Sequence, residues 1–210
     1  MAFTFKKASC VVAGTFNMYV IQPPWFTKIG IFPKGIEVAI GTHLDEPGFR
    51  YAPTKNPFRW FVTPHRVEVE TRDPEGDCGA PMASVLEALP WTPLVALGNN
   101  VIYTAPLADL DGLREEFRRS PQAPEGYAMK QRSMHFGLSR EGAVMNLQLS
   151  ITPEELELSV NTHTELRKKE SEDAQAAARR FIQDRRDAET LIQQLFGVSV
   201  EYGNRNTEQA

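Results

Sequence analysis

Cysteine is scarce in this sequence. Cys10 and Cys78 are the two cysteines among 210 residues, and no C-x-x-C spacing occurs. The sequence therefore predicts neither a disulfide framework nor a cysteine-based zinc site. In a chain of this size two thiols are expected to stay reduced, which is typical of a cytoplasmic protein.

Long apolar runs are also missing. The sequence holds no stretch of about 18 apolar residues, the length that a transmembrane helix needs. Lys6 and Lys7 precede an apolar run near the start, but Gly14, Asn17 and Gln22 interrupt it, so it makes a poor signal peptide. We therefore expect no membrane partner.

The net charge of the sequence is small. A formal net charge of -4 and a pI near 5.7 argue against a protein that coats nucleic acid with its whole surface. A local basic patch stays open as an alternative. With 41% hydrophobic residues, the chain has enough apolar surface for one domain or for two closely packed halves.

Catalytic and cofactor motifs are absent. The sequence contains no GxxxxGK[ST], GxGxxG, GxSxG or H-E-x-x-H pattern. His43, Asp45 and Glu46 could ligate a metal, but they stand in a predicted turn without a second cluster, and the other histidines are scattered. We assign no catalytic residue, no metal and no cofactor, and we expect no enzymatic activity.

Two residues keep an enzyme open as a third hypothesis. Cys78 precedes a predicted helix, whose dipole would lower the pKa of the thiol, while Glu75 and Asp77 would raise it. His163 lies on a predicted strand. An unrecognised active site would gather Cys78 or His163 with carboxylates in a concave pocket.

The first part of the chain carries strand patterns. Over residues 66–71 the alternation is strict, so Val67 and Val69 should point inward and Glu68 and Glu70 outward. A proline-opened helical turn is predicted at 22–30. Strands are predicted at 8–16, 36–40, 49–52, 58–63 and 66–71, with 36–40 buried.

A helix and a further strand follow. Pro81 suits the first turn of a helix that ends before Pro90. Residues 94–104 read as a strand interrupted by a bulge near Gly98 and Asn99. The order strand, helix, strand predicts a split βαβ unit, as in ferredoxin-like folds.

The remaining residues predict a second half. The Pro/Gly/Ser-rich link at 120–126 separates residues 1–119 from residues 127–202, and 203–210 is expected to be a flexible tail. Alternating strands at 129–138, 143–151 and 156–163 form a β-meander. The predicted fold is therefore α+β: a mainly antiparallel sheet in two linked halves, covered by helices.

The longest predicted helix is uninterrupted and amphipathic, spanning residues 171–196. At 1.5 Å per residue it reaches about 39 Å, longer than most strands that it could cover. Part of its apolar stripe should therefore extend beyond its own sheet and contact a partner. The residues predicted to bind that partner are Ala174, Ala178, Phe181, Arg185 and Ile192.

Basic and aromatic residues are interleaved between residues 48 and 67, where no acidic residue occurs. On an exposed sheet face such residues could hold phosphates and stack bases. The alternative is that the aromatic residues are core and the arginines surround them. The candidate nucleic-acid residues are Arg50, Lys55, Arg59, Trp60 and Arg66.

The sequence resembles an uncharacterised bacterial family of small cytoplasmic α+β proteins. The resemblance rests on patches over about half of the chain, at 16–17, 22–25, 60–62, 66–71, 89–100 and 160–163. It implies a bacterial protein with this fold and carries over no catalytic residue. An accessory role in a multi-gene system such as anti-phage defence follows from the resemblance alone.

These observations lead to a main hypothesis and an alternative. We expect a non-enzymatic interaction or scaffold subunit that forms a homo-oligomer or docks a protein partner through its terminal helix and exposed strand edges. The alternative is a nucleic-acid-binding module that uses the face formed by residues 48–67.

Overall fold

The computed structural model describes residues 2–42, 47–118, 130–140, 143–166 and 171–202. These residues form a mixed fold in which helices pack against a mostly antiparallel sheet. The link at 120–126, the tail at 203–210 and the possible ligands His43, Asp45 and Glu46 lie outside the described residues.

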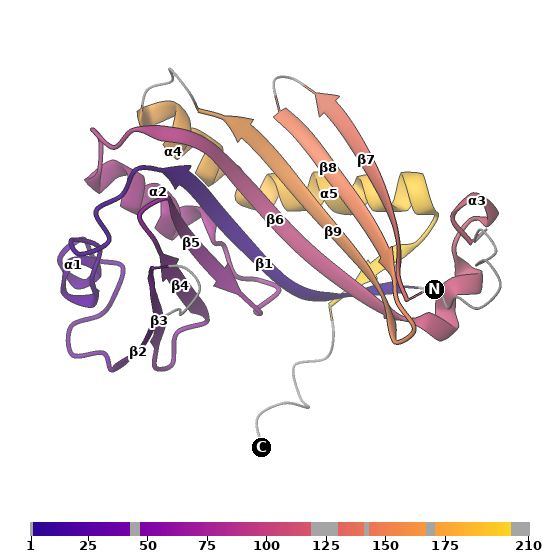
Figure 1. Ribbon diagram of the computed structural model, residues 1–210, viewed down its shortest axis with the longest axis horizontal. Helices are drawn as coiled ribbons and strands as arrows, with labels where there is room; N and C mark the ends of the chain where they lie inside the picture. The colour runs from indigo at the N-terminus through magenta and orange to yellow at the C-terminus, as the bar shows by residue number, and fades with distance from the viewer. Residues whose placement is uncertain (1, 43–46, 119–129, 141–142, 167–170, 203–210) are drawn as a thin grey trace.

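A ten-stranded sheet runs through the described part of the chain (Figure 1). Neighbours along the path β2-β3-β4-β5-β1-β6-β9-β8-β7 are antiparallel, and β10 pairs with β1 in parallel. The strands are β1 (Ala2–Gly14), β2 (Val38–Thr42), β3 (Phe49–Pro53), β4 (Phe58–Val62), β5 (Arg66–Thr71), β6 (Leu94–Pro106), β7 (Arg132–Arg140), β8 (Ala143–Ile151), β9 (Glu155–Glu165) and β10 (Ser199–Glu201).

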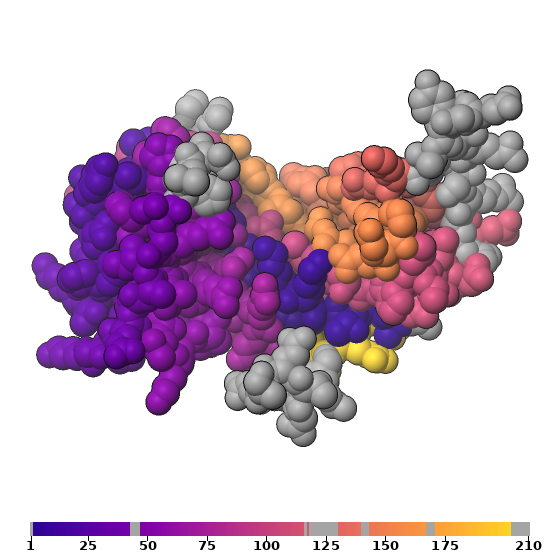
Figure 2. Space-filling model, turned by 60° about the horizontal axis from the view of Figure 1, so that its bottom comes forward, coloured from indigo at the N-terminus to yellow at the C-terminus, as the bar shows by residue number. Residues whose placement is uncertain are grey.

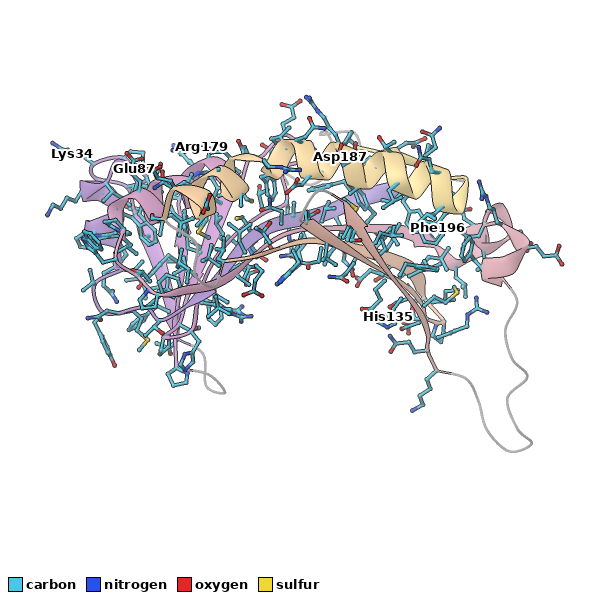
Figure 3. The ribbon with its side chains drawn as sticks, turned by 90° about the horizontal axis from the view of Figure 1, so that it is seen from above. Lys34, Glu87, His135, Arg179, Asp187 and Phe196 are labelled. Atoms are coloured by element: carbon cyan, nitrogen blue, oxygen red, sulfur yellow. The ribbon has the colours of Figure 1, made fainter. Side chains whose placement is uncertain are left out.

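Helices cover one face of this sheet. Viewed from above, α2, α4 and α5 lie along the convex side, and the sheet bends so that its other face is concave (Figure 3). That concave face carries no helix among the described residues. The helices are α1 (Pro23–Lys28), α2 (Gly79–Ala88), η1 (Leu107–Gly112, a 3-10 helix), α3 (Glu115–Arg118), α4 (Ser171–Arg179) and α5 (Phe181–Phe196).

The order of the strands contains a split βαβ arrangement. β5 and β6 are both antiparallel to β1, which lies between them, so they run parallel to each other and α2 connects them. β7, β8 and β9 follow as an antiparallel meander. β9 pairs along the length of β6, from Ala96 opposite Glu165 to Pro106 opposite Glu155, so the sheet is continuous.

The main core lies between the sheet and the helices. Val67 and Val69 of β5 are fully buried there, while Glu68 and Glu70 point to the concave face, as the alternation predicts. The apolar face of α2 packs onto the same layer through Met82, Val85 and Leu86. Removing these side chains from water drives the helix onto the sheet.

Two predictions about strands were wrong. Residues 36–40 do not form a buried strand, since β2 is the end strand of the sheet and Ile40 is 57% exposed. β6 has no bulge at Gly98 and Asn99 but pairs regularly there. A Cβ at residue 98 would lie 2.6 Å from Nδ2 of Asn161, so a larger residue would force the Asn161 side chain to move.

The prediction of one uninterrupted helix at 171–196 was also wrong, because α4 and α5 are separated at Arg180. The carbonyl of Ala177 accepts a 3.3 Å hydrogen bond from the Arg180 amide and another, also 3.3 Å, from Nδ2 of Asn99 in β6. A polar side chain that inserts into a helical hydrogen-bond ladder bends or breaks the helix. Gly79 lets the start of α2 approach this break.

Gly79→Ala should destabilise the fold strongly. A Cβ at residue 79 would lie 2.5 Å from Cβ of Phe181 and would clash with the backbone of Ala178. Overpacking of this kind costs about 1–3 kcal/mol, or more where backbone cannot move. Urea denaturation measures the loss in the free energy of unfolding.

Gly41→Ala is the matched control. Gly41 lies in the exposed end strand, and a Cβ there would be 3.8 Å from the nearest atom, in Arg50. Its stability should change by less than about 0.5 kcal/mol. Equal stabilities of the two variants would show that Gly79 does not allow a close approach.

Candidate functional site

The predicted partner-binding stripe lies inside the protein. Ala174, Ala178, Phe181 and Ile192 are at most 2% exposed, because α4 and α5 turn these side chains onto the sheet. Arg185 is partly buried and donates a 2.5 Å hydrogen bond to the carbonyl of Pro74. The stripe is therefore an internal packing face, and only the α5 surface outside the stripe is left for contacts with a partner.

The flank of α5 next to this stripe borders a groove of about 600 Å³, which we call the hairpin groove. The β7–β8 hairpin and α5 form its two walls. Its apolar lining is Leu138, Ala143, Met145 and Leu191. Its polar lining is Ser139, Thr162, Arg180, Gln183, Asp184, Asp187, Thr190 and Gln194.

Side-chain size explains where the groove lies. At the C-terminal end of α5, the ring of Phe196 packs at 4.8 Å from Phe117 and 5.8 Å from Phe136, so aromatic groups fill the space between helix and hairpin. Nearer the start of α5, the facing residues are the smaller Ala143 and Thr162. Close packing is therefore incomplete there, and the groove remains.

Asp184 is a buried carboxylate at the base of the hairpin groove, only 6% exposed. Its Oδ2 accepts a 2.7 Å hydrogen bond from Nδ2 of Asn99, and its Oδ1 lies 3.5 Å from the guanidinium of Arg180. Burial raises the pKa of Asp184 above its ordinary value, although the Asn99 hydrogen bond and the Arg180 charge oppose the rise.

A small internal cavity lies on the sheet side of Asp184. Its volume is about 10 Å³, and it is lined by residues that include Asn99, Thr162, Phe181 and Ala188. Thr162 and Asp184 line both this cavity and the hairpin groove. Oδ1 of Asn99 is buried and accepts no hydrogen bond from the described residues. A hydrogen-bond acceptor is thus left at this position.

The concave face holds a second groove, also of about 600 Å³, which we call the arginine groove. It brings together four of the candidate nucleic-acid residues: Arg50 of β3, Arg59 and Trp60 of β4, and Arg66 of β5. The concave face is hollowed between the N-terminal strands and β8 and β9 (Figure 2). The remaining charged groups of the arginine groove are Lys7, Glu68, Glu70 and Arg72.

Trp60 and Lys55 differ from the three arginines. Trp60 is 2% exposed and packs on Phe26 from the helix side, so it is core and cannot stack a base. Lys55 lies between β3 and β4, with φ at 58°, and does not line the arginine groove. The aromatic residues that line the groove are Tyr51, Trp60 and Phe61, of which Phe61 contacts the arginines.

Phe61 is flanked by two cations. The guanidinium carbons of Arg50 and Arg66 lie 5.3 Å and 4.7 Å from its ring centre. Cation–π contacts of this kind hold the two arginine side chains in place on the sheet. The alternation of β3, β4 and β5 thus presents positive charge to the concave face and aromatic bulk to the core.

The residues of the enzyme hypothesis do not meet. Cys78 is fully buried, where burial and then the charge of Asp77 raise the pKa of its thiol. His163 lies on β9 opposite Gly98 and Val144, far along the sheet from β5 and α2. Within the described ranges, no group of three or more His, Cys, Asp or Glu residues could hold a metal. None of the described helices is long and apolar enough to cross a membrane.

A row of polar side chains crosses the concave face, and sequence reasoning missed it. Asn161 Nδ2 donates a 2.6 Å hydrogen bond to Oδ1 of Asn100, and Asn100 Nδ2 donates one of 3.4 Å to the hydroxyl of Ser9. Asn146 continues the row on β8, opposite Asn161. The adjacent Asn99 and Asn100 were a signal, since neighbours on a regular strand face opposite sides.

Asp184 was also missed, although its spacing gave a signal. It follows Phe181 by three residues and precedes Ala188 by four, so it belongs to the buried stripe of the helix. A carboxylate at such a position needs a specific partner. That partner, Asn99, is 85 residues away in the sequence.

No protein-family model matches the sequence, and no curated protein matches it. The resemblance to an uncharacterised bacterial family therefore stays a prediction. The two grooves and the residues that line them are the basis for the function proposed below.

Asp184 should make the stability of the protein depend on pH. Because burial raises its pKa in the folded state above the ordinary 3.8, the folded chain binds this proton more tightly than the unfolded chain does. The stabilisation is complete below pH 3.8 and is lost as the pH rises through the raised pKa.

Comparison with Asp184→Asn isolates this effect, since asparagine keeps an oxygen acceptor for Asn99 and does not titrate. The free energy of unfolding of the wild type minus that of the variant should fall through this pH window and level off above it. Urea denaturation at a series of pH values measures the difference. A difference that increases with pH would contradict the assignment.

Proposed function

We propose that this protein is a non-enzymatic interaction subunit that docks a segment of a protein partner in the hairpin groove. The observation that carries the proposal is the combination of an apolar wall and hydrogen-bonding groups in one groove beside the last strand of the sheet. Peptide-binding sites commonly pair an apolar groove with a few polar groups that fix the orientation of the segment.

The edge of the sheet supports this proposal. β7 ends the strand order, so its outer side has no strand partner among the described residues. Unpaired backbone groups on an edge strand can accept an added strand from another chain. Leu138, which lines the hairpin groove near the end of β7, is 37% exposed. It adds apolar surface at the position where a docked segment would lie.

The proposal also covers the organisation of the chain, its oligomeric state and its cellular setting. We infer that residues 1–119 and 127–202 act as two linked halves of the sheet, with the docking surface on the second. A homo-oligomer is the form the proposal takes if the docked segment comes from another copy of the chain. We also infer a bacterial, cytoplasmic protein with an accessory role in a multi-gene system. The two buried, free thiols of Cys10 and Cys78 agree with a reducing compartment.

Leu138→Glu should abolish partner docking, because it places a charge on the apolar wall of the hairpin groove. Val95→Glu is the matched control: Val95 is 38% exposed, close to the 37% of Leu138, and does not line the groove. Light scattering gives the mass of each variant. Pull-down from the native host, with a photo-crosslinking residue at Gln194, identifies a partner that touches the groove.

The wild type and Val95→Glu should give the same crosslinked product, and Leu138→Glu should give none. A crosslink to a second copy, together with a doubled mass, would identify self-association as the docking event. An identical product from Leu138→Glu would contradict docking in this groove, as would a monomer that crosslinks to nothing.

A nucleic-acid-binding module is the second candidate, and the arginine groove favours it. Lys7, Arg50, Arg59, Arg66 and Arg72 outnumber the two acidic residues there, Glu68 and Glu70. Lys7 pairs with Glu70 at 3.3 Å, which leaves the arginines as the larger source of positive potential. Phosphates of a single strand could bind them without base stacking on Trp60.

The combined variant Arg50→Glu, Arg59→Glu and Arg66→Glu should remove salt-sensitive binding of single-stranded DNA or RNA. Three lost phosphate contacts would reduce the slope of log K against log salt by roughly two to three. The control carries the same charge change at exposed positions: Lys34→Glu and Arg179→Glu, both labelled in Figure 3, and Arg186→Glu on α5. Fluorescence anisotropy measures both. No binding by the wild type at low salt would exclude this function.

A further inference from the structure

We propose that the hairpin groove selects a lysine side chain, with the ammonium group bound at Asp184 and the methylene stem lying along the apolar wall. This inference rests on the proposed function, because it names the chemical group by which the docked segment is recognised. Its basis is the arrangement of acceptors, charges and space around Asp184.

The small cavity that adjoins the groove at Thr162 and Asp184 offers an acceptor, because Asn99 lines it. The amide nitrogen of Asn99 donates both to the carbonyl of Ala177 and to Oδ2 of Asp184, which fixes the orientation of the amide group. Its oxygen is therefore left as an acceptor, and the Asn99 side chain is more than nine-tenths buried. A buried acceptor beside a buried carboxylate favours a group that donates hydrogen bonds and carries positive charge.

The charges of the groove leave room for one more cation. Asp184 and Asp187 carry two carboxylates, and Arg180 is the one cation among the described residues that line the groove. The 3.5 Å separation of Arg180 and Asp184 exceeds the usual 2.7–2.9 Å of a charge-assisted hydrogen bond, and Arg180 is 53% exposed. Asp187 accepts a 2.8 Å hydrogen bond from the neutral Gln183. An added ammonium group would balance the charge.

The available space favours lysine over arginine. The cavity beside Asp184 and Thr162 has a volume of about 10 Å³, roughly that needed by one water molecule. A compact ammonium group has this size, whereas a planar guanidinium group is larger and more rigid. The stem of lysine is also apolar and can lie on hydrophobic side chains while its charged end is bound elsewhere. Leu138, Met145 and Leu191 provide that surface.

The test uses three small probes: the Nα-acetyl, N-methylamide derivatives of lysine, norleucine and arginine. Each is titrated into the full chain while the backbone amide shifts of Thr162, Asp184 and Leu191 are followed by NMR. The lysine derivative should bind at least about tenfold more tightly than the other two. Asp184→Asn should weaken it by about tenfold or more, because the charged partner is lost.

Glu87→Gln is the matched control for charge. It removes one carboxylate from an exposed position on α2, and the affinity for the lysine derivative should not change. Equal affinities of the lysine and norleucine derivatives would overturn the proposal, as would binding that survives Asp184→Asn or no shift with any of the probes.

A second variant keeps the test decisive if Asp184→Asn does not fold. Met145 lies directly opposite Thr162 in the β8–β9 pairing and lines the groove. Met145→Lys supplies an ammonium group from the chain itself, so it should prevent binding of the lysine derivative, whereas Met145→Leu should retain it. Equal binding by these two variants would contradict the proposal.

The results also separate the two proposals. If the probes fail but Leu138→Glu still abolishes the partner crosslink, the docking function stands and the lysine preference is wrong. If the lysine derivative binds as expected but Leu138→Glu leaves the crosslink unchanged, the site exists and docking occurs elsewhere.

Discussion

One amide group joins the two layers of this protein. Nδ2 of Asn99, on β6, donates to the carbonyl of Ala177 near the end of α4 and to the carboxylate of Asp184 on α5. These two hydrogen bonds pair the carbonyl of Ala177 at the helix break and the buried carboxylate of Asp184. Leaving either group without a partner would be costly. The break at Arg180 and the position of α5 over the sheet depend on it. A buried polar network of this kind also specifies one arrangement of the helices.

Fixing α5 in this way separates the roles of its faces. The apolar stripe turns inward and completes the core, so its contribution is to stability. The adjacent flank, which shares Asp184 with the stripe, faces the β7–β8 hairpin across a gap that aromatic residues fill at one end only. On the other side of the sheet, the alternation of β3, β4 and β5 gathers arginines without any helix to cover them. Both candidate sites are therefore consequences of how one sheet distributes its two faces.

Local patterns predicted much of this fold. The alternation at Val67 and Val69 placed their side chains correctly because one face of β5 is buried, and the prolines around α2 marked its limits. Features that depend on distant residues could not be predicted. The exposure of Ile40 follows from the end position of β2, the helix break follows from Asn99, and the core position of Trp60 follows from packing on Phe26. For the terminal helix, the residues predicted to bind a partner from the apolar pattern alone instead pack in the core.

The pairing of β1 with β10 has a consequence for the order of assembly. Ala2 lies opposite Ser199, so the first strand of the chain completes its pairing only with one of the last. Contacts between such distant residues are entropically costly to close and slow the folding of a chain. Because β1 is synthesised before β10, the pairing of Ala2–Thr4 waits until β10 has also been synthesised. Until then the backbone groups of Ala2–Thr4 lack their partners in β10. Protection of the nascent chain by chaperones would matter most during that interval.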